Sequence, residues 1–134
     1  MFLFDTNMCI FIIKNKFNNV LERSKKTRYK GLFISSITLA ELEFGIENAK
    51  TEYNAKNKIA LMEFLTIFEV KNFDGIAAKA YGKIRKDLKD RNCLIGPFDM
   101  LIGAHAKSLN MTLVTNNTKE FARISGLTIE DWTK

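Results

Sequence analysis

Hydrophobic and polar positions divide the chain into two kinds of segment. Short apolar runs bounded by polar residues are typical of strands buried on both faces, whereas apolar residues three or four apart indicate amphipathic helices. We expect strands at residues 1–4, 31–36, 68–73, 111–117 and 126–132. We expect helices at residues 7–16, 18–26, 37–50, 51–67, 75–91 and 98–109, with a helical turn at 119–125. This alternation predicts an α/β fold, a parallel sheet with helices on both faces.

Polar residues at the boundaries of the helices support these limits. Pro97 stands at the first position of a helix, which proline favours. The candidate N-terminal caps of four other helices are Asn7, Asn18, Ser36 and Asp74. No linker, repeat or low-complexity tract interrupts the pattern, so residues 1–134 are expected to form a single domain.

Acidic and amide side chains follow two of the predicted strands. Asp5 comes directly after the apolar run MFLF, and Asn116, Asn117 and Glu120 come just after MTLVT. The carboxyl ends of parallel strands meet at one edge of an open sheet, where such sheets bind ligands. We therefore expect these side chains to share a cleft.

Two further acids depart from the pattern of their helices. Glu41 falls outside the polar face that Glu43 and Glu47 form, and therefore points toward the interior. A lone ionised carboxylate there is costly, so we expect a positive group to meet Glu41. Asp99 falls beside small residues such as Gly103, a face that permits close approach of another backbone.

Carboxylates from several segments at one edge suit a hard divalent cation. Magnesium takes a few carboxylate oxygens and completes its shell with water or phosphate oxygens. Two such ions could bind an attacking water and stabilise the leaving oxygen of a phosphodiester. Taken singly, each acid also has a structural alternative: Asp5 could start a turn, Asp99 could support its helix through the macrodipole, and Glu120 could be surface charge.

The remaining inventory argues against other chemistries. His105, the only histidine, falls among apolar residues about 240° round the helix from Asp99 and is expected to pack in the core. No Ser, Thr or Cys has a recognisable base partner, and no glycine-rich phosphate loop follows a strand. Cys9 and Cys93 lack the spacing of zinc ligands, so we expect reduced, structural thiols.

The composition adds an electrostatic expectation. The 134 residues are 46% hydrophobic and carry 21 basic against 15 acidic residues, a net charge of +6 with a pI near 9.4. This balance favours a polyanionic partner, above all nucleic acid, although each basic cluster, around Tyr29 and along residues 79–91, could equally be a solvated face. No apolar run reaches the roughly 20 residues of a membrane span, and no signal peptide is present, so we expect a cytoplasmic protein.

Four strings in a fixed order carry a family resemblance: FDTN, SSITLAELEFGI, IGPFDMLIGAHA and LVTNNTKEFARISGLTIEDW. With them, nearly the whole chain resembles the PIN-domain ribonucleases, specifically VapC-type toxins of bacterial toxin–antitoxin pairs. The resemblance implies a three-layer α/β/α sandwich around a parallel sheet and dependence on magnesium or manganese. It also implies endonucleolytic cleavage of a structured RNA, leaving a 3′-hydroxyl and a 5′-phosphate. A tRNA is the usual target, and the anticodon loop of initiator tRNA is the expected one here, with inhibition of translation as the result.

The resemblance also assigns roles to individual residues. Asp5, Glu41 and Asp99 match the three acidic metal-site positions, with Thr6 and Asn7 as polar support. The family further implies that a VapB-type antitoxin wraps the chain, pushes a cationic side chain into the acidic notch and mediates any contact with DNA. Apolar helices within residues 32–65 are expected to form a homodimer face.

One position departs from the family pattern. Many PIN domains carry an acid where Asn117 stands here, and the nearest acid is Glu120. We expect Glu120 to act as the fourth acid, with Asn116 or Asn117 donating a hydrogen bond. Setting the four proposed acids aside leaves 11 acidic against 21 basic residues, a net charge of +10 that would draw RNA toward the notch.

Two alternatives to this function stay open from the sequence. A haloacid-dehalogenase-like phosphatase would use Asp5 as its nucleophile, but its signature requires a second acid at the position of Asn7. A non-catalytic basic RNA-binding module would use its acids only structurally, and the apolar setting of Glu41 disfavours it.

Overall fold

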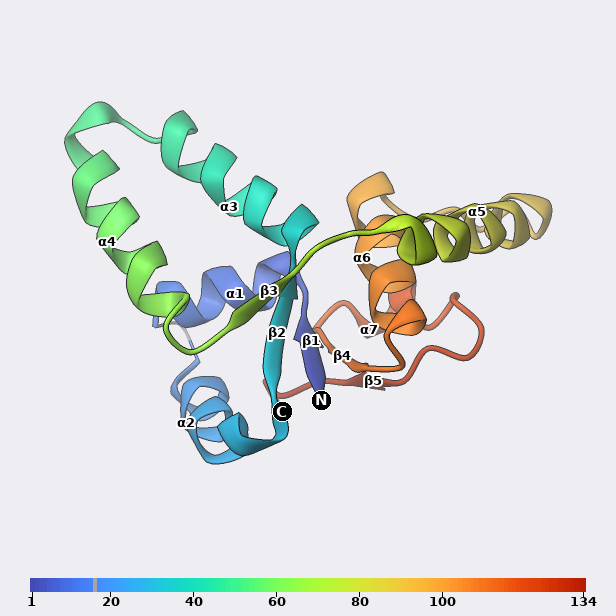
Figure 1. Cartoon of the computed structure of the whole chain (residues 1–134), viewed down its shortest axis with the longest axis horizontal. Coiled ribbons are helices and arrows are strands. Elements are labelled where there is room, and N and C mark those ends of the chain that lie inside the picture. The colour runs from blue at the N-terminus through green and yellow to red at the C-terminus, as the bar shows by residue number, and fades with distance from the viewer. Residues whose placement is uncertain (16) are drawn as a thin grey trace.

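Five parallel strands form one sheet in the computed structural model, which describes residues 1–15 and 17–134. Their order across the sheet is β3-β2-β1-β4-β5 (Figure 1). Their bounds are β1 Phe2–Phe4, β2 Leu32–Ser35, β3 Glu69–Lys71, β4 Thr112–Val114 and β5 Ile129–Glu130. The predicted parallel sheet is confirmed, and every strand is shorter than its apolar run suggested.

The helices occupy both faces of the sheet. Their bounds are α1 Thr6–Ile13, α2 Asn18–Thr27, α3 Ser36–Asn48, α4 Asn54–Phe64, α5 Gly75–Asp90, α6 Pro97–Ser108 and α7 Thr118–Phe121. Asp74 caps α5 and Pro97 begins α6, as predicted. The predicted helix 7–16 ends early, and its last position, Lys16, lies outside the described residues. Within the described part of the chain, none of the helices has the length and apolar character that crossing a membrane requires.

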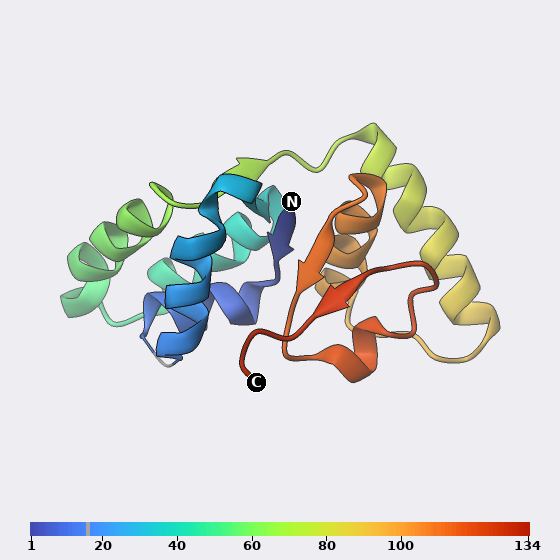
Figure 2. The same ribbon diagram turned by 90° about the horizontal axis from the view of Figure 1, so that it is seen from below.

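Two apolar clusters on opposite faces of the sheet establish the layers. Leu3 belongs to the cluster under α5, α6 and α7, whereas Phe4 belongs to the cluster under α1 to α4. Successive residues of a strand point to opposite faces, so neighbours in β1 enter different cores. Figures 1 and 2 show α1 to α4 on one side of the strands and α5 to α7 on the other. The three-layer α/β/α sandwich is confirmed.

Three of the predicted helix caps lie at the wrong residue. Asp5 caps α1 in place of Asn7, and Ser35 caps α3 in place of Ser36, because these side chains accept a backbone N–H of the first helical turn. Asn18 is itself the first residue of α2, and the residue before it makes no side-chain capping bond. The helix starts are therefore set one or two residues away from the expected ones.

Helix α6 packs closely in the second core. His105 is buried there, with its Nδ1 2.8 Å from Ser35 Oγ and its ring edge-on to Phe73, so the predicted core histidine is confirmed. Burial holds the pKa of this imidazole below its usual value. A Cβ on Gly103 would lie 2.5 Å from Ile124 Cδ1, so a side chain, and not the expected backbone, approaches the helix here.

Both cysteines carry free thiols, as predicted. Cys9 is buried in α1, and Cys93 is half-buried after α5. Burial raises the pKa of the Cys9 thiol well above its usual value, so this side chain stays protonated. It therefore behaves as a small apolar group of the core.

Candidate active site

Asp5 stands where β1 ends and α1 begins, at the carboxyl edge of the sheet. Its Oδ1 accepts the backbone N–H of Met8 at 2.9 Å, and its Oδ2 accepts the hydroxyl of Thr115 at 2.5 Å. The residue is only 2% exposed, and burial raises the pKa of its carboxyl to about 6. The charges of Asp99 and Glu41 add to this rise, whereas the two hydrogen bonds oppose it. Asp5 is therefore a buried acid fixed in orientation by both of its oxygens.

Glu41 lies half-buried on α3 and faces the start of α1. Its Oε1 accepts the hydroxyl of Thr6 at 2.6 Å, so Thr6 supports this acid directly. Within the described residues, none of the ion pairs involves Glu41, so the positive group expected to meet this acid stays a prediction. The Thr6 hydroxyl gives Glu41 one hydrogen bond because α1 brings Thr6 against α3.

Asp99 occupies the first turn of α6 and is half-buried. Burial raises the pKa of its carboxyl, and the charges of Glu120 and Glu41 raise it further. A hydrogen bond from the Asn117 side chain acts in the opposite direction. These influences show that acids from α3, α6 and α7 lie close enough to affect one another.

Three of the predicted acids share one pocket of about 450 Å³. Asp5, Glu41 and Asp99 come from the end of β1, from α3 and from α6, respectively. The other lining residues are Thr6, Asn7, Ile10, Ala40, Phe44 and Phe98. The structure therefore brings together the three acids and the two polar residues beside Asp5 that the sequence singled out.

The remaining predicted residues lie at the margin of this pocket. Glu120 is not among the residues that line it, and its Oε2 accepts the amide of Asn117 at 3.2 Å. Asn116 is exposed, and its side chain makes no hydrogen bond within the described part of the chain. Glu120 therefore does not line the pocket. It affects the pocket through its charge, which acts on Asp99, and through its hydrogen bond with Asn117.

Thr115 is a site residue that the sequence reasoning missed. Phe4 pairs with Val114 in the parallel register of β1 and β4, which places the next residues, Asp5 and Thr115, side by side. Thr115 is fully buried, and its hydroxyl holds Asp5. The signal in the sequence was a polar residue directly after an apolar strand. Knowing that β4 lies beside β1 would have been enough to place Thr115 next to Asp5.

The donor set fits a divalent cation of the magnesium type. Its oxygens belong to like-charged groups, and none of the ion pairs between described residues neutralises Asp5, Glu41 or Asp99. In the described residues, no three acidic, His or Cys side chains lie close enough to hold one ion together. Magnesium commonly binds through one or two carboxylates and completes its shell with water and phosphate oxygens. Such an ion would therefore take part of its shell from substrate or solvent.

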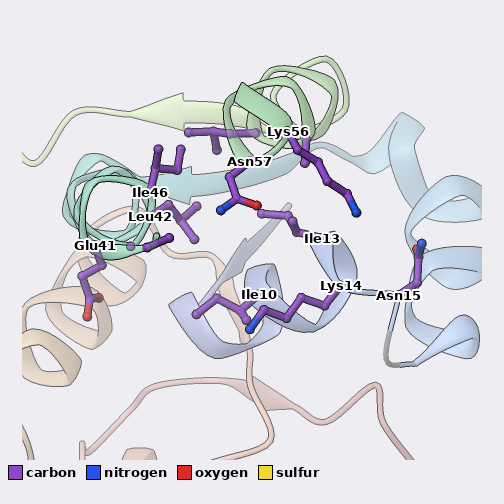
Figure 3. Close-up of a pocket in the computed structure, with 13 residues that line it drawn as sticks. Ile10, Ile13, Lys14, Asn15, Glu41, Leu42, Ile46, Lys56 and Asn57 are labelled. Carbon is purple, nitrogen blue, oxygen red and sulfur yellow. The ribbon is translucent and has the colours of Figure 1, made fainter. Parts of the chain in front are cut away.

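An apolar groove of about 600 Å³ adjoins the acidic pocket. It runs between α1, α3 and α4, and Glu41 and Ile10 line both cavities. Figure 3 shows Ile13, Leu42 and Ile46 along the groove, with Glu41 at one end and Asn15 at the other. The side chains of Lys14 and Lys56 add positive charge to its lining (Figure 3).

A family model described as the PIN domain matches residues 2–127. The chain belongs to the PIN-domain family. This PIN domain is 43% identical over 131 residues to the tRNA(fMet)-specific endonuclease VapC of Shigella flexneri, covering 98% of this chain and 97% of that protein. It is 38% identical to ribonuclease VapC2 of Rickettsia felis, over 99% of this chain and 98% of that one.

Solved structures extend the match to three dimensions. VapBC2 from Rickettsia felis bound to a promoter DNA fragment gives a TM-score of 0.92 at 34% identity, covering 98% of both chains. DNA-bound VapBC from Salmonella typhimurium gives 0.91 at 41% identity, covering 98% of this chain and 97% of that one. The predicted resemblance is confirmed, and this PIN domain is a VapC-type ribonuclease. The phosphatase and the non-catalytic module are therefore set aside.

Proposed function

We propose that this PIN domain is the toxin of a type II toxin–antitoxin pair and a magnesium-dependent endoribonuclease that acts on a tRNA. The observation that carries the proposal is the pocket where Asp5, Glu41 and Asp99 converge, without a cationic partner among the described residues. A relative of nearly equal length is named a tRNA(fMet)-specific endonuclease, which supports initiator tRNA as the substrate; we propose its anticodon loop as the place of cleavage. Cleavage there would inhibit translation in the cytoplasm.

One or two of the carboxylates of Asp5, Glu41 and Asp99 would bind the ion, magnesium or manganese, and water or phosphate oxygens would complete its shell. When bound, it supplies Lewis-acid catalysis for hydrolysis of the phosphodiester. The hydroxyls of Thr6 and Thr115 hold Glu41 and Asp5 in orientation, which limits the rearrangement that ion binding requires.

Four further residues that the sequence indicated belong to the proposed site. Asn7 is exposed at the pocket wall, where its amide can donate to a phosphate oxygen. Glu120 and Asn117 adjust the charge and orientation of Asp99 from outside the pocket. Asn116 is exposed at the same edge of the sheet, within reach of a bound RNA. The net charge of +10 on the rest of the chain attracts the RNA backbone toward these acids.

A VapB-type antitoxin is the proposed protein partner. The structural neighbours are VapBC complexes, two of them bound to DNA, and we propose that this chain meets DNA only through its antitoxin. The groove between α1, α3 and α4 would receive an apolar segment of the antitoxin, and Lys14 and Lys56 would pair with acidic residues on it. Because Glu41 lines groove and pocket alike, a cationic side chain of the same segment would neutralise the acids.

A homodimer is proposed through the apolar helices within residues 32–65. Ile59 and Met62 of α4 are 56% and 69% exposed, a pair of large apolar side chains one helical turn apart. Such a pair is costly to leave in water and suits a contact with a second copy. Sedimentation of the purified chain would return a dimer mass, and Met62→Glu would return the monomer.

Expression of matched variants in one host tests the proposed activity. Wild type is expected to arrest growth and create new RNA ends within one tRNA, whereas Asp5→Asn and Asp99→Asn do neither. Asp74→Asn serves as the control, because this exposed acid caps α5 away from the pocket. Unchanged RNA scission in both pocket variants would contradict the assignment, and the mapped ends of the wild-type products identify the substrate.

A further inference from the structure

Two large aromatic side chains stand exposed at the acidic pocket. Phe44 is 67% exposed and Phe98 is 53% exposed, yet both line the pocket that contains Asp5, Glu41 and Asp99. Within the described residues, neither ring pairs with another aromatic ring. Single exposed apolar residues are ordinary on protein surfaces, but two unpaired rings beside three acids in one pocket require a reason.

Each ring is fixed within one helical turn of an acid. Phe44 follows Glu41 by three residues on α3, a spacing that puts both side chains on one face of the helix. Phe98 directly precedes Asp99 in the first turn of α6. Because both rings project from helices rather than loops, their distances from the acids are restricted before any substrate arrives.

We propose that Phe44 and Phe98 are stacking platforms for unpaired bases on either side of the phosphate bound at the acids. This inference rests on the proposed function and names the form of RNA that the site takes, a single-stranded segment. Every base offers a π-face to an aromatic ring, so phenylalanine binds unpaired bases without reading their sequence. Bases within a duplex are already stacked on one another and cannot lie on these rings. The pocket therefore selects a loop over a stem, and sequence preference arises elsewhere on the chain.

A cycle of protein and RNA changes tests the stacking directly. The probe is a stem–loop RNA with a single-stranded loop, compared with the same RNA carrying one abasic nucleotide beside the cleaved position. Binding is measured with the Asp99→Asn chain, which keeps both rings. We expect Phe44→Ala or Phe98→Ala to weaken binding of the intact loop by about 5- to 150-fold, the range for stacking on one base. The variant that lacks the ring facing the abasic position should bind the abasic RNA as well as the parent chain does, because the base that would stack on that ring is already missing.

Conservative variants separate stacking from apolar contact. Phe44→Tyr and Phe98→Tyr are expected to restore binding, whereas Phe44→Leu and Phe98→Leu are expected to remain weak, because leucine is apolar but has no π-face. Tyr53→Ala is the matched control, since Tyr53 is a 51% exposed aromatic that does not line the pocket. Leucine variants that bind as well as wild type would overturn the proposal, as would losses that are equal on intact and abasic RNA for both Phe44→Ala and Phe98→Ala.

The alternative occupant of the rings is a second copy of this chain. If Phe44→Ala or Phe98→Ala converts a dimer to a monomer in sedimentation and weakens all RNAs equally, the rings belong to a subunit contact and the proposal is wrong. Its failure is distinct from that of the proposed function. If wild type cleaves RNA and all ring variants bind normally, the stacking proposal is wrong and the ribonuclease activity is unaffected. If the ring variants lose binding only to RNA that carries the base, but wild type cleaves no RNA, the stacking proposal holds and the proposed function is wrong.

Discussion

Asp5→Asn is expected to stabilise the folded chain at neutral pH although it removes an acid from the proposed catalytic pocket. Burial raises the pKa of the Asp5 carboxyl to about 6 from a reference value of 3.8. The folded protein thus holds this proton more tightly than the unfolded chain does. The contribution to stability is therefore fully present below the unfolded value of 3.8 and is lost as the pH rises through about 6.

The size of the effect follows from the difference between these two pKa values. About two pKa units correspond to about 3 kcal/mol of folding free energy lost above pH 6. Asparagine keeps an acceptor for the Met8 N–H but makes a neutral hydrogen bond with Thr115 in place of a charge-assisted one, a loss of about 1 kcal/mol. The net gain is about 2 kcal/mol, or roughly 7 °C in Tm for a domain of this length.

Unfolding of wild type and Asp5→Asn by urea, in chelator and at two pH values, measures this gain. At about pH 4.5 the wild-type carboxyl is largely protonated in the folded state, so the advantage of the variant should shrink by about 2 kcal/mol. Asp74→Asn is the matched control, because Asp74 also accepts a first-turn N–H of its helix but is exposed, and its change should stay within about 0.5 kcal/mol. A variant less stable than wild type at neutral pH, or a gain that does not vary with pH, would refute the reasoning.

Three further outcomes follow from the packing and the site. Gly103→Ala should lower the free energy of unfolding by about 1–3 kcal/mol, because the new Cβ would collide with Ile124 Cδ1. Adding Ile124→Val removes this Cδ1 and should recover part of the loss. Urea unfolding of wild type, the single variant and the double variant measures both effects. Glu120→Gln should slow single-turnover RNA cleavage less than Asp99→Asn, because Glu120 acts from outside the pocket. Lys56→Glu should weaken titrated antitoxin binding and leave cleavage unchanged, and equal losses in both assays would place the groove within the RNA site.

The fold was largely predictable because its strands and helices have different hydrophobic periods. The exact helix starts were not, since adjacent residues can be equally good caps by type. Ser35 caps α3, while the hydroxyl of Ser36 accepts the backbone N–H of Phe73, a residue far along the chain. Asp5, and not Asn7, caps α1, because the carboxylate that was expected to face the cleft also accepts the backbone N–H of Met8 in the helix that follows it.

The site was predictable as far as local patterns reach. The helical period identified Glu41 as an acid off the polar face, and the strand pattern placed Asp5 at the sheet edge. The hydrogen-bond partners of these acids come from other segments, so the sequence did not show which hydroxyls hold them, and Thr115 was overlooked. Glu120 follows β4 as expected, and its side chain accepts the Asn117 amide while its charge acts on Asp99, so its role as the fourth acid stays a prediction.

A structural role alone does not explain why residue 5 is an aspartate. Asparagine, serine and aspartate cap helices about equally well, and asparagine could also bond to the Thr115 hydroxyl. With the carboxyl buried and its pKa raised to about 6, ionised aspartate costs about 3 kcal/mol at neutral pH, and asparagine would recover about 2 kcal/mol of this after its weaker bond to Thr115. The like charges of Glu41 and Asp99 in the same pocket are part of that cost. Three acids at one sheet edge, without a cationic partner among the described residues, are unfavourable for folding, and binding of a cation and a phosphodiester is the benefit that accounts for them.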